Sequence, residues 1–151
     1  MFKKTLFLLA LCVPALVSAT SVPEKSLEMM VREADHVIVA TVIEVDMVDG
    51  LGRPVTQPKA RTGPGLKNQM RFRLSVEEVL STRGAKLPRR IVVPLWQMWH
   101  YSLGTMQTEV TGTRGIFLLK GKDFQPVHHA GFQRSLGERV EIERLLRERT
   151  R

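Results

Sequence analysis

One segment rich in β-branched residues constrains the fold most. Residues 36–46 read HVIVATVIEVD, and one parity of this stretch stays apolar or neutral: Val37, Val39, Thr41, Ile43 and Val45. Acidic residues enter only on the other parity, at Glu44 and Asp46. A period of two residues predicts a β-strand with one face turned to the interior. The fold is therefore expected to be organised around a sheet.

Four further segments predict strands. Met70, Phe72, Leu74 and Val76 alternate with polar residues, and the phase breaks at Glu77–Glu78, which is typical of a β-bulge. Residues 90–96, 116–119 and 124–128 are the other three, and Pro94 favours an edge position for the first of them. Residues 48–67, rich in glycine and proline, predict a long mobile connection.

Two helices are expected to flank these strands. Ser21 and Glu24 form a capping-box pattern before apolar residues at helical spacing, and Ser135 and Glu138 repeat the pattern before a helix over about 136–148. A common core should bury nine apolar residues: Val39, Ile43, Phe72, Leu74, Val76, Ile91, Val93, Phe117 and Leu119.

Three motifs lie in an order that resembles a known family. They are Ala34–Val37 (ADHV), Val76–Leu80 (VEEVL) and Gly115–Leu118 (GIFL). Over residues 24–128 the chain resembles small exported bacterial domains related to the netrin and tissue-inhibitor-of-metalloproteinase type of OB-fold barrel. The resemblance implies a mainly β fold, a five-stranded OB-like barrel with a short N-terminal helix and a C-terminal helix.

The chain departs from the family pattern at two places. Thr41 stands where the family often has glycine, and Ser81-Thr82-Arg83 replaces the usual Lys-Gly ending. The animal inhibitors chelate the zinc of their target through an amino-terminal cysteine, whereas the single cysteine here is Cys12. Their inhibitory mechanism therefore does not transfer, and a fold carries no function by itself.

The first 19 residues have the order of a secretory signal peptide. Lys3 and Lys4 precede an apolar run from Leu6 to Val17, and the small residues Ser18 and Ala19 close it. The run is shorter than a membrane span. We expect cleavage near Ala19/Thr20, a periplasmic or secreted single domain over residues 20–151, and no stable membrane span afterwards.

The charge is uneven along the chain. Residues 20–49 hold two basic and seven acidic residues, and residues 50–95 hold ten basic and two acidic ones. This asymmetry predicts a basic face and an anionic partner, with Arg71 and Arg73 on the outward parity of their strand as candidate contacts. A merely solvated, soluble surface is the alternative.

Catalytic chemistry finds little support in the sequence. The four histidines are His36, His100, His128 and His129, and none has a partner at helical metal-ligand spacing. His128 and His129 are adjacent in a predicted strand and should point to opposite faces. We find no nucleophile elbow and no phosphate loop, so no catalytic residue, metal ligand or cofactor is assigned.

Residues 96–101 (WQMWHY) hold both tryptophans and the single tyrosine. Aromatic side chains beside cations form stacking platforms, so Trp99, His100 and Tyr101 are candidate ligand contacts. Trp96 is assigned instead to the core, and Trp99 and Tyr101 could equally plug one end of a barrel.

These features predict a non-enzymatic, exported binding module for a protein or anionic glycan of the cell envelope, with no nucleic acid expected as a partner. Two alternatives remain: a small secreted inhibitor or immunity-type protein, and a metal-dependent envelope hydrolase using His100 or the His128–His129 pair.

Overall fold

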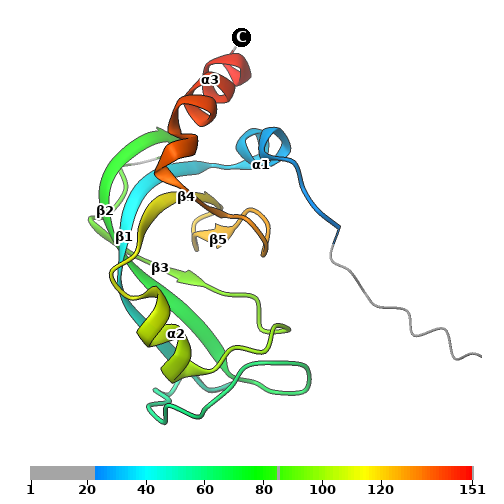
Figure 1. The fold of residues 1–151 in the computed structure, drawn as a ribbon, viewed down its shortest axis with the longest axis vertical. Coiled ribbons are helices and arrows are strands. Elements are labelled where there is room, and N and C mark those ends of the chain that lie inside the picture. Colours follow the sequence, from blue (N-terminus) through cyan, green and yellow to red (C-terminus); the bar gives the residue numbers. More distant parts are fainter. Residues whose placement is uncertain (1–22, 85, 151) are drawn as a thin grey trace, which may run out of the picture.

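The computed structural model describes residues 23–84 and 86–150, and in this range the protein is mainly β. These residues form a six-stranded antiparallel sheet accompanied by three α-helices (Figure 1). The mainly β prediction is confirmed. The predicted signal peptide, its cleavage position and the Ser21 cap lie outside the described residues.

The sheet is built around β1 (His36–Val48), which pairs with β2 (Gln69–Thr82) on one side and β4 (Arg114–Lys120) on the other. β3 (Arg90–Pro94) pairs with β2, and the short β5 (Gln125–Pro126) and β6 (Gln133–Arg134) both pair with β4. The order β4-β1-β2-β3 is that of a Greek key.

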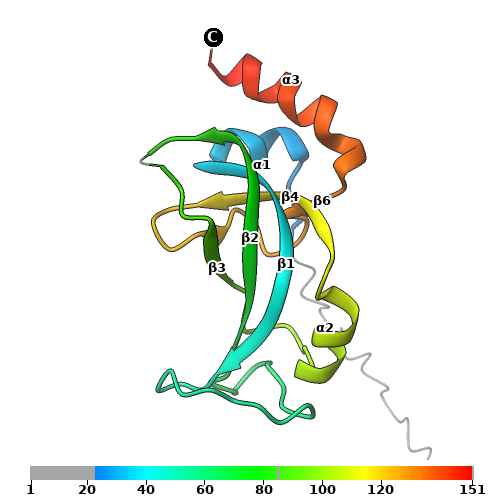
Figure 2. The same cartoon turned by 90° about the vertical axis from the view of Figure 1, so that its left-hand side faces the viewer.

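Bulges bend the long β1–β2 pair. The register between the two strands skips Leu80, Glu77 and Ile43. A bulge adds an unpaired residue and increases the local twist, and Figure 2 shows both strands strongly curved. The bulge predicted at Glu77–Glu78 is confirmed.

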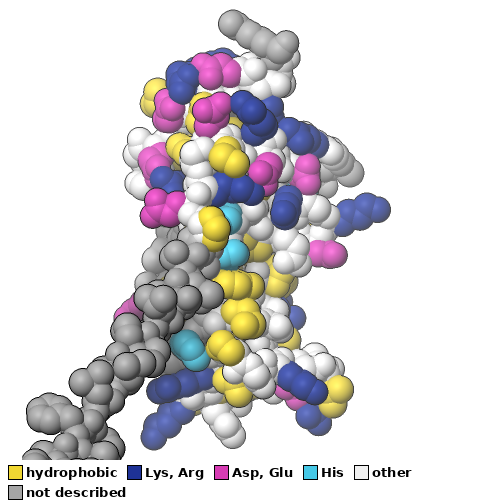
Figure 3. Space-filling model, turned by 90° about the vertical axis from the view of Figure 1, so that its right-hand side faces the viewer, with side chains coloured by type: hydrophobic (Ala, Val, Ile, Leu, Met, Phe, Trp, Pro, Cys, Tyr) yellow, Lys and Arg dark blue, Asp and Glu magenta, His cyan; other side chains and the backbone are white. Residues whose placement is uncertain are grey.

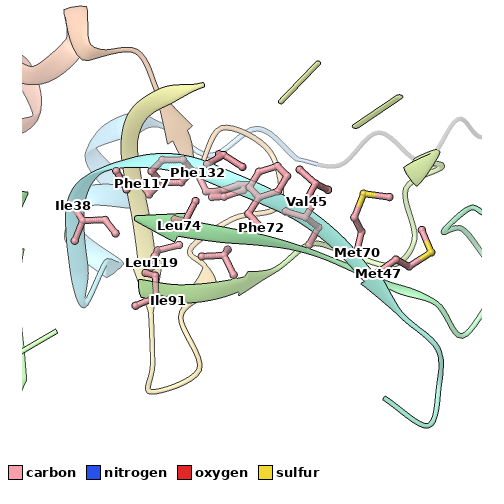
Figure 4. Packing of buried hydrophobic residues seen from close by; sticks show 14 of the residues in the cluster. Ile38, Val45, Met47, Met70, Phe72, Leu74, Ile91, Phe117, Leu119 and Phe132 are labelled. Atoms are coloured by element: carbon pink, nitrogen blue, oxygen red, sulfur yellow. The ribbon is translucent and has the colours of Figure 1, made fainter. Parts of the chain in front are cut away.

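The main core lies on the concave side of this curved sheet (Figure 4). Six of the nine residues predicted to be buried together belong to it: Phe72, Leu74, Ile91, Val93, Phe117 and Leu119, and Val76 packs against it partly buried. The prediction for Ile43 is wrong, because its side chain is 40% exposed. The bulge at Ile43 shifts the alternation of β1 by one residue. The main core therefore takes Val42 before the bulge and Val45 after it.

Val39 belongs to a second core on the other side of the sheet. There β1 and β4 are covered by α1 (Leu27–Glu33) and α3 (Arg139–Arg149), whose Met30, Ile142 and Leu145 are buried against them. The Ser135–Glu138 capping box is present before η1 (Leu136–Glu138), which leads into α3, as the sequence predicts. The cap of α1 is Ser26, which accepts a hydrogen bond from the Met29 amide at 3.2 Å.

The sheet is not closed into the five-stranded barrel that the sequence predicts. Its two ends, β3 and β5, approach each other, but within residues 23–84 and 86–150 no ladder joins them. Each edge carries a proline, Pro94 or Pro126, which has no N–H to donate. β5 is accordingly shorter than the strand predicted over 124–128, and β6 and α2 (Leu103–Val110) were not predicted.

Candidate binding cleft

A cleft opens where the two edges of the sheet diverge. Residues 94–98, from the last residue of β3 onward, form one wall. Residues 125–129, which are β5 and the segment after it, form the other, with Lys25, Gln69 and Lys120 at the margin. The cleft has a volume of about 510 Å³. Its place follows from the unpaired edges, because no other strand of the described residues covers either wall.

Five side chains form an aromatic cluster beside the cleft: Trp96, Trp99, Tyr101, His128 and His129. The rings of Trp96 and His129 stack with centroids 3.9 Å apart, and those of His128 and His129 with centroids 4.4 Å apart. Trp99 meets both Trp96 and His129 edge-on at 5.9 Å. Such mutual contacts hold the rings in fixed orientations.

The cluster reaches the surface. Trp96 remains 37% exposed although it stacks on His129, and Met98 and Met29 beside it are exposed too. A second hollow of about 380 Å³ adjoins the first and shares Trp96, His128 and His129 with it. On this face hydrophobic side chains run in a column between the histidines (Figure 3). Placing Trp96 in the core was therefore wrong.

His128 and His129 do not point to opposite faces, as the strand pattern predicts. β5 ends at Pro126, so strand geometry does not extend to either histidine. The backbone turns instead, and His128 Nδ1 lies 2.9 Å from the carbonyl oxygen of Ala130. This turn stacks the two rings.

Among the described residues, the ionisable side chains that line the larger cleft are all basic: Lys25, Lys120, His128 and His129. The Lys25 ammonium donates to Glu33 at 2.5 Å, so part of that charge is neutralised. Burial, together with the charge of His128, lowers the pKa of His129. Its Nε2 is buried and has no hydrogen-bond partner among the described residues. At neutral pH His129 is therefore uncharged and acts as an aromatic ring.

The β1–β2 connection holds the aromatic segment in place. Thr62, fully buried, donates its hydroxyl to the Trp99 carbonyl at 2.7 Å and accepts from the Tyr101 amide at 3.1 Å. Gly63, at φ 147°, brings the chain against His100, where a Cβ atom would lie 2.6 Å from Nδ1. The connection predicted to be mobile is tied to residues 99–101.

The five predicted site residues fall into two groups. Trp99 and Tyr101 belong to the aromatic cluster and the exposed His100 lies next to them, while Tyr101 also packs against the main core and burial raises its pKa to about 12. Arg71 and Arg73 line neither hollow. Both donate to Asp46 on β1, each through Nε at 2.7 Å.

Sequence reasoning missed the contribution of Trp96, His129 and Thr62. For His129 the available signal was the nearby Pro126, which ends the strand and frees both histidine rings from alternation.

Within residues 23–84 and 86–150, no group of three or more His, Cys, Asp or Glu side chains is placed to hold a metal ion. In the same range no helix has the length and apolar character needed to cross a membrane.

In comparisons with known proteins, no family model and no curated protein matches the chain.

Proposed function

We propose that the chain is an exported, non-enzymatic binding module that engages an anionic partner of the cell envelope, a protein or a glycan, through the aromatic cleft. The observation that carries the proposal is Trp96, whose ring is held by stacking on His129 while 37% of the residue stays exposed. A large aromatic side chain that is both oriented and exposed is typical of a contact surface.

Two further features support this function. The rings already support one another, so little side-chain entropy would be lost when a ligand contacts them. Lys120, which makes no ion pair among the described residues, adds a positive charge to the lining of the cleft, and this favours a partner that carries negative charge.

The fold that goes with this proposal is an OB-like barrel left open between β3 and β5. The Greek-key order, the position of α2 between β3 and β4, and the approach of β3 to β5 support it. OB folds are five-stranded, partly open Greek-key barrels that bind ligands on a sheet face and its loops. Export rests on the signal-peptide pattern of residues 1–19.

The test is a tryptophan-fluorescence titration of the purified chain with two anionic polymers, polygalacturonate and polyglutamate. We expect saturable binding of at least one of them, weakened by salt because exposed charges are screened beyond about 10 Å at 0.1 M ionic strength. Trp96→Ala should weaken binding at least about tenfold, the effect of losing one aromatic anchor, without lowering the melting temperature appreciably.

Val140→Ala is the matched control, because Val140 is 78% exposed and lies on α3, outside both hollows and away from the β1–β2 connection. It should leave binding unchanged. If neither polymer binds, or if Trp96→Ala binds as the unchanged chain does, the proposed function is wrong.

A further inference from the structure

We propose that the cleft is one end of a longer stripe that takes a linear acidic polysaccharide, whose chain runs from Lys120 across the tryptophans to the cations of the β1–β2 connection. This proposal rests on the proposed function and names the class of its ligand. It follows from three parts of one face: a basic cleft, an aromatic middle and a second basic end.

The middle of the stripe suits sugar rings. The flat C–H face of a pyranose packs on an exposed indole, and its hydroxyls need donors and acceptors at the edge. Gln97 and Gln125, on opposite walls of the cleft, are exposed, and in the described part of the chain neither side-chain amide has an intramolecular hydrogen bond. Each offers both a carbonyl oxygen and an NH₂ group to hydroxyls.

The second basic end lies next to the aromatic segment. Arg61 forms an isolated β-bridge with Ser102, and its neighbour Thr62 bonds to Trp99 and Tyr101. Figure 3 shows Lys and Arg side chains over the connection, beyond the histidine at the foot of the hydrophobic column. The stripe thus continues from the cleft to this end.

Several cations of this end have no ion-pair partner in the part of the chain that the structure describes. Among the residues that the structure describes, Lys59, Arg61 and Lys67 make no ion pair, and neither does Lys120 at the cleft. By contrast, Arg53 of the same connection is paired with Asp49 at 2.7 Å. A ligand with regularly spaced carboxylates would meet unpaired cations at both ends of the stripe.

A polysaccharide fits this surface better than an extended acidic peptide. A peptide that binds at a sheet edge gains its affinity from backbone hydrogen bonds. Pro94 and Pro126 remove an N–H donor from the two edges that border the cleft. Ring platforms and side-chain amides remain, and these recognise sugars without a backbone ladder.

Chain length provides the test. A tri-galacturonate is short enough to occupy the cleft alone, whereas a long oligogalacturonate can reach the second end. We expect the long ligand to bind more tightly, and Lys59→Ala/Arg61→Ala to weaken the long ligand about tenfold while leaving the short one unchanged, as for two exposed charge contacts.

The matched control is Lys86→Ala/Arg147→Ala, which also removes two charges from positions outside both hollows and outside the connection. It should bind both ligands as the unchanged chain does. Equal affinity for the short and long ligands, or equal weakening by the two double variants, overturns the proposal.

Two outcomes separate this proposal from the one on which it rests. If polyglutamate binds tightly, depends on Trp96 and outcompetes the oligogalacturonate, the ligand is an acidic protein and only the present proposal is overturned. If no anionic ligand binds and Trp96→Ala has no effect, both proposals are wrong.

Discussion

His129 shows how much one ring contributes to the aromatic cluster. It stacks on Trp96 and His128, and its Nε2 atom is buried without a partner in the described range. A buried polar atom that is not hydrogen-bonded costs stability. The position is therefore used for its ring more than for its hydrogen-bonding capacity.

The variant His129→Phe tests this interpretation. Phe keeps the stacking and removes the unpaired nitrogen, so we expect the free energy of unfolding at pH 7 to stay the same or rise by up to about 1 kcal/mol. The pKa of His129 is lower in the folded than in the unfolded chain, so the unfolded state binds more protons as pH falls below about 6.5. The wild-type chain should therefore lose stability from pH 7 to pH 5, and the variant less. Urea titrations between pH 5 and pH 7 measure the free energy of unfolding of both proteins. The same pH dependence for the two would contradict the prediction.

At the scale of elements, the β1–β2 pair carries its own charge network on the outer face. Asp46 accepts hydrogen bonds from Arg71 and Arg73, which lie opposite and diagonally across the register. Burial opposes ionisation of Asp46, but the bonds from the two arginines outweigh it, so its pKa is lowered. The two arginines therefore have a structural partner, and reversing both to Glu would place carboxylates against Asp46.

Asp46→Asn tests the network. We expect it to lower the free energy of unfolding at pH 7 by about 1 kcal/mol, a value reduced for partial solvent screening. Because folding lowers the pKa of Asp46, its contribution is present above about pH 3.8 and is lost as pH falls through the folded pKa. Glu44→Gln changes a more exposed partner of Arg73, so it should lower the free energy of unfolding by less than half as much as Asp46→Asn does. Urea titrations at pH 7 and pH 3 measure both effects, and an equal loss at the two pH values would contradict the prediction.

At the scale of the whole molecule, the sheet is buried on both faces over part of its area. The concave side holds the main core, and α1 and α3 form a second core over β1 and β4. Arg149 in the last turn of α3 donates to the carbonyl oxygens of Val31 at 3.0 Å and Ala34 at 2.8 Å, which ties the two helices together. The C-terminal helix is thus part of the folded unit.

Ile142→Ala tests that inference. Ile142 is fully buried in the second core, so its truncation should cost about 2–5 kcal/mol. Val140→Ala on the same helix should change stability by less than about 0.5 kcal/mol, because Val140 is 78% exposed. Chemical denaturation followed by circular dichroism compares them. A small effect of Ile142→Ala would mean that α3 contributes little to the fold.

Features that depend on neighbouring residues were predictable. The alternation of Phe72 and Leu74 with Arg71 and Arg73, the bulge near Glu77 and the capping box at Ser135 each arise from local geometry, and each is present. Part of the site was predictable in the same way, because Trp99 and Tyr101 lie in the aromatic-rich segment.

By itself, the sequence located β1 to β5, though not the short β6, and the start of the capped C-terminal helix, because period, turn residues and caps act over a few positions. Only the tertiary structure decided which face Ile43 takes, that Arg71 and Arg73 share Asp46, and that Trp96 stacks on His129 across the gap between β3 and β5. These outcomes depend on register and on edges that remain unpaired. They are set by contacts between residues far apart in the chain, which no local pattern encodes.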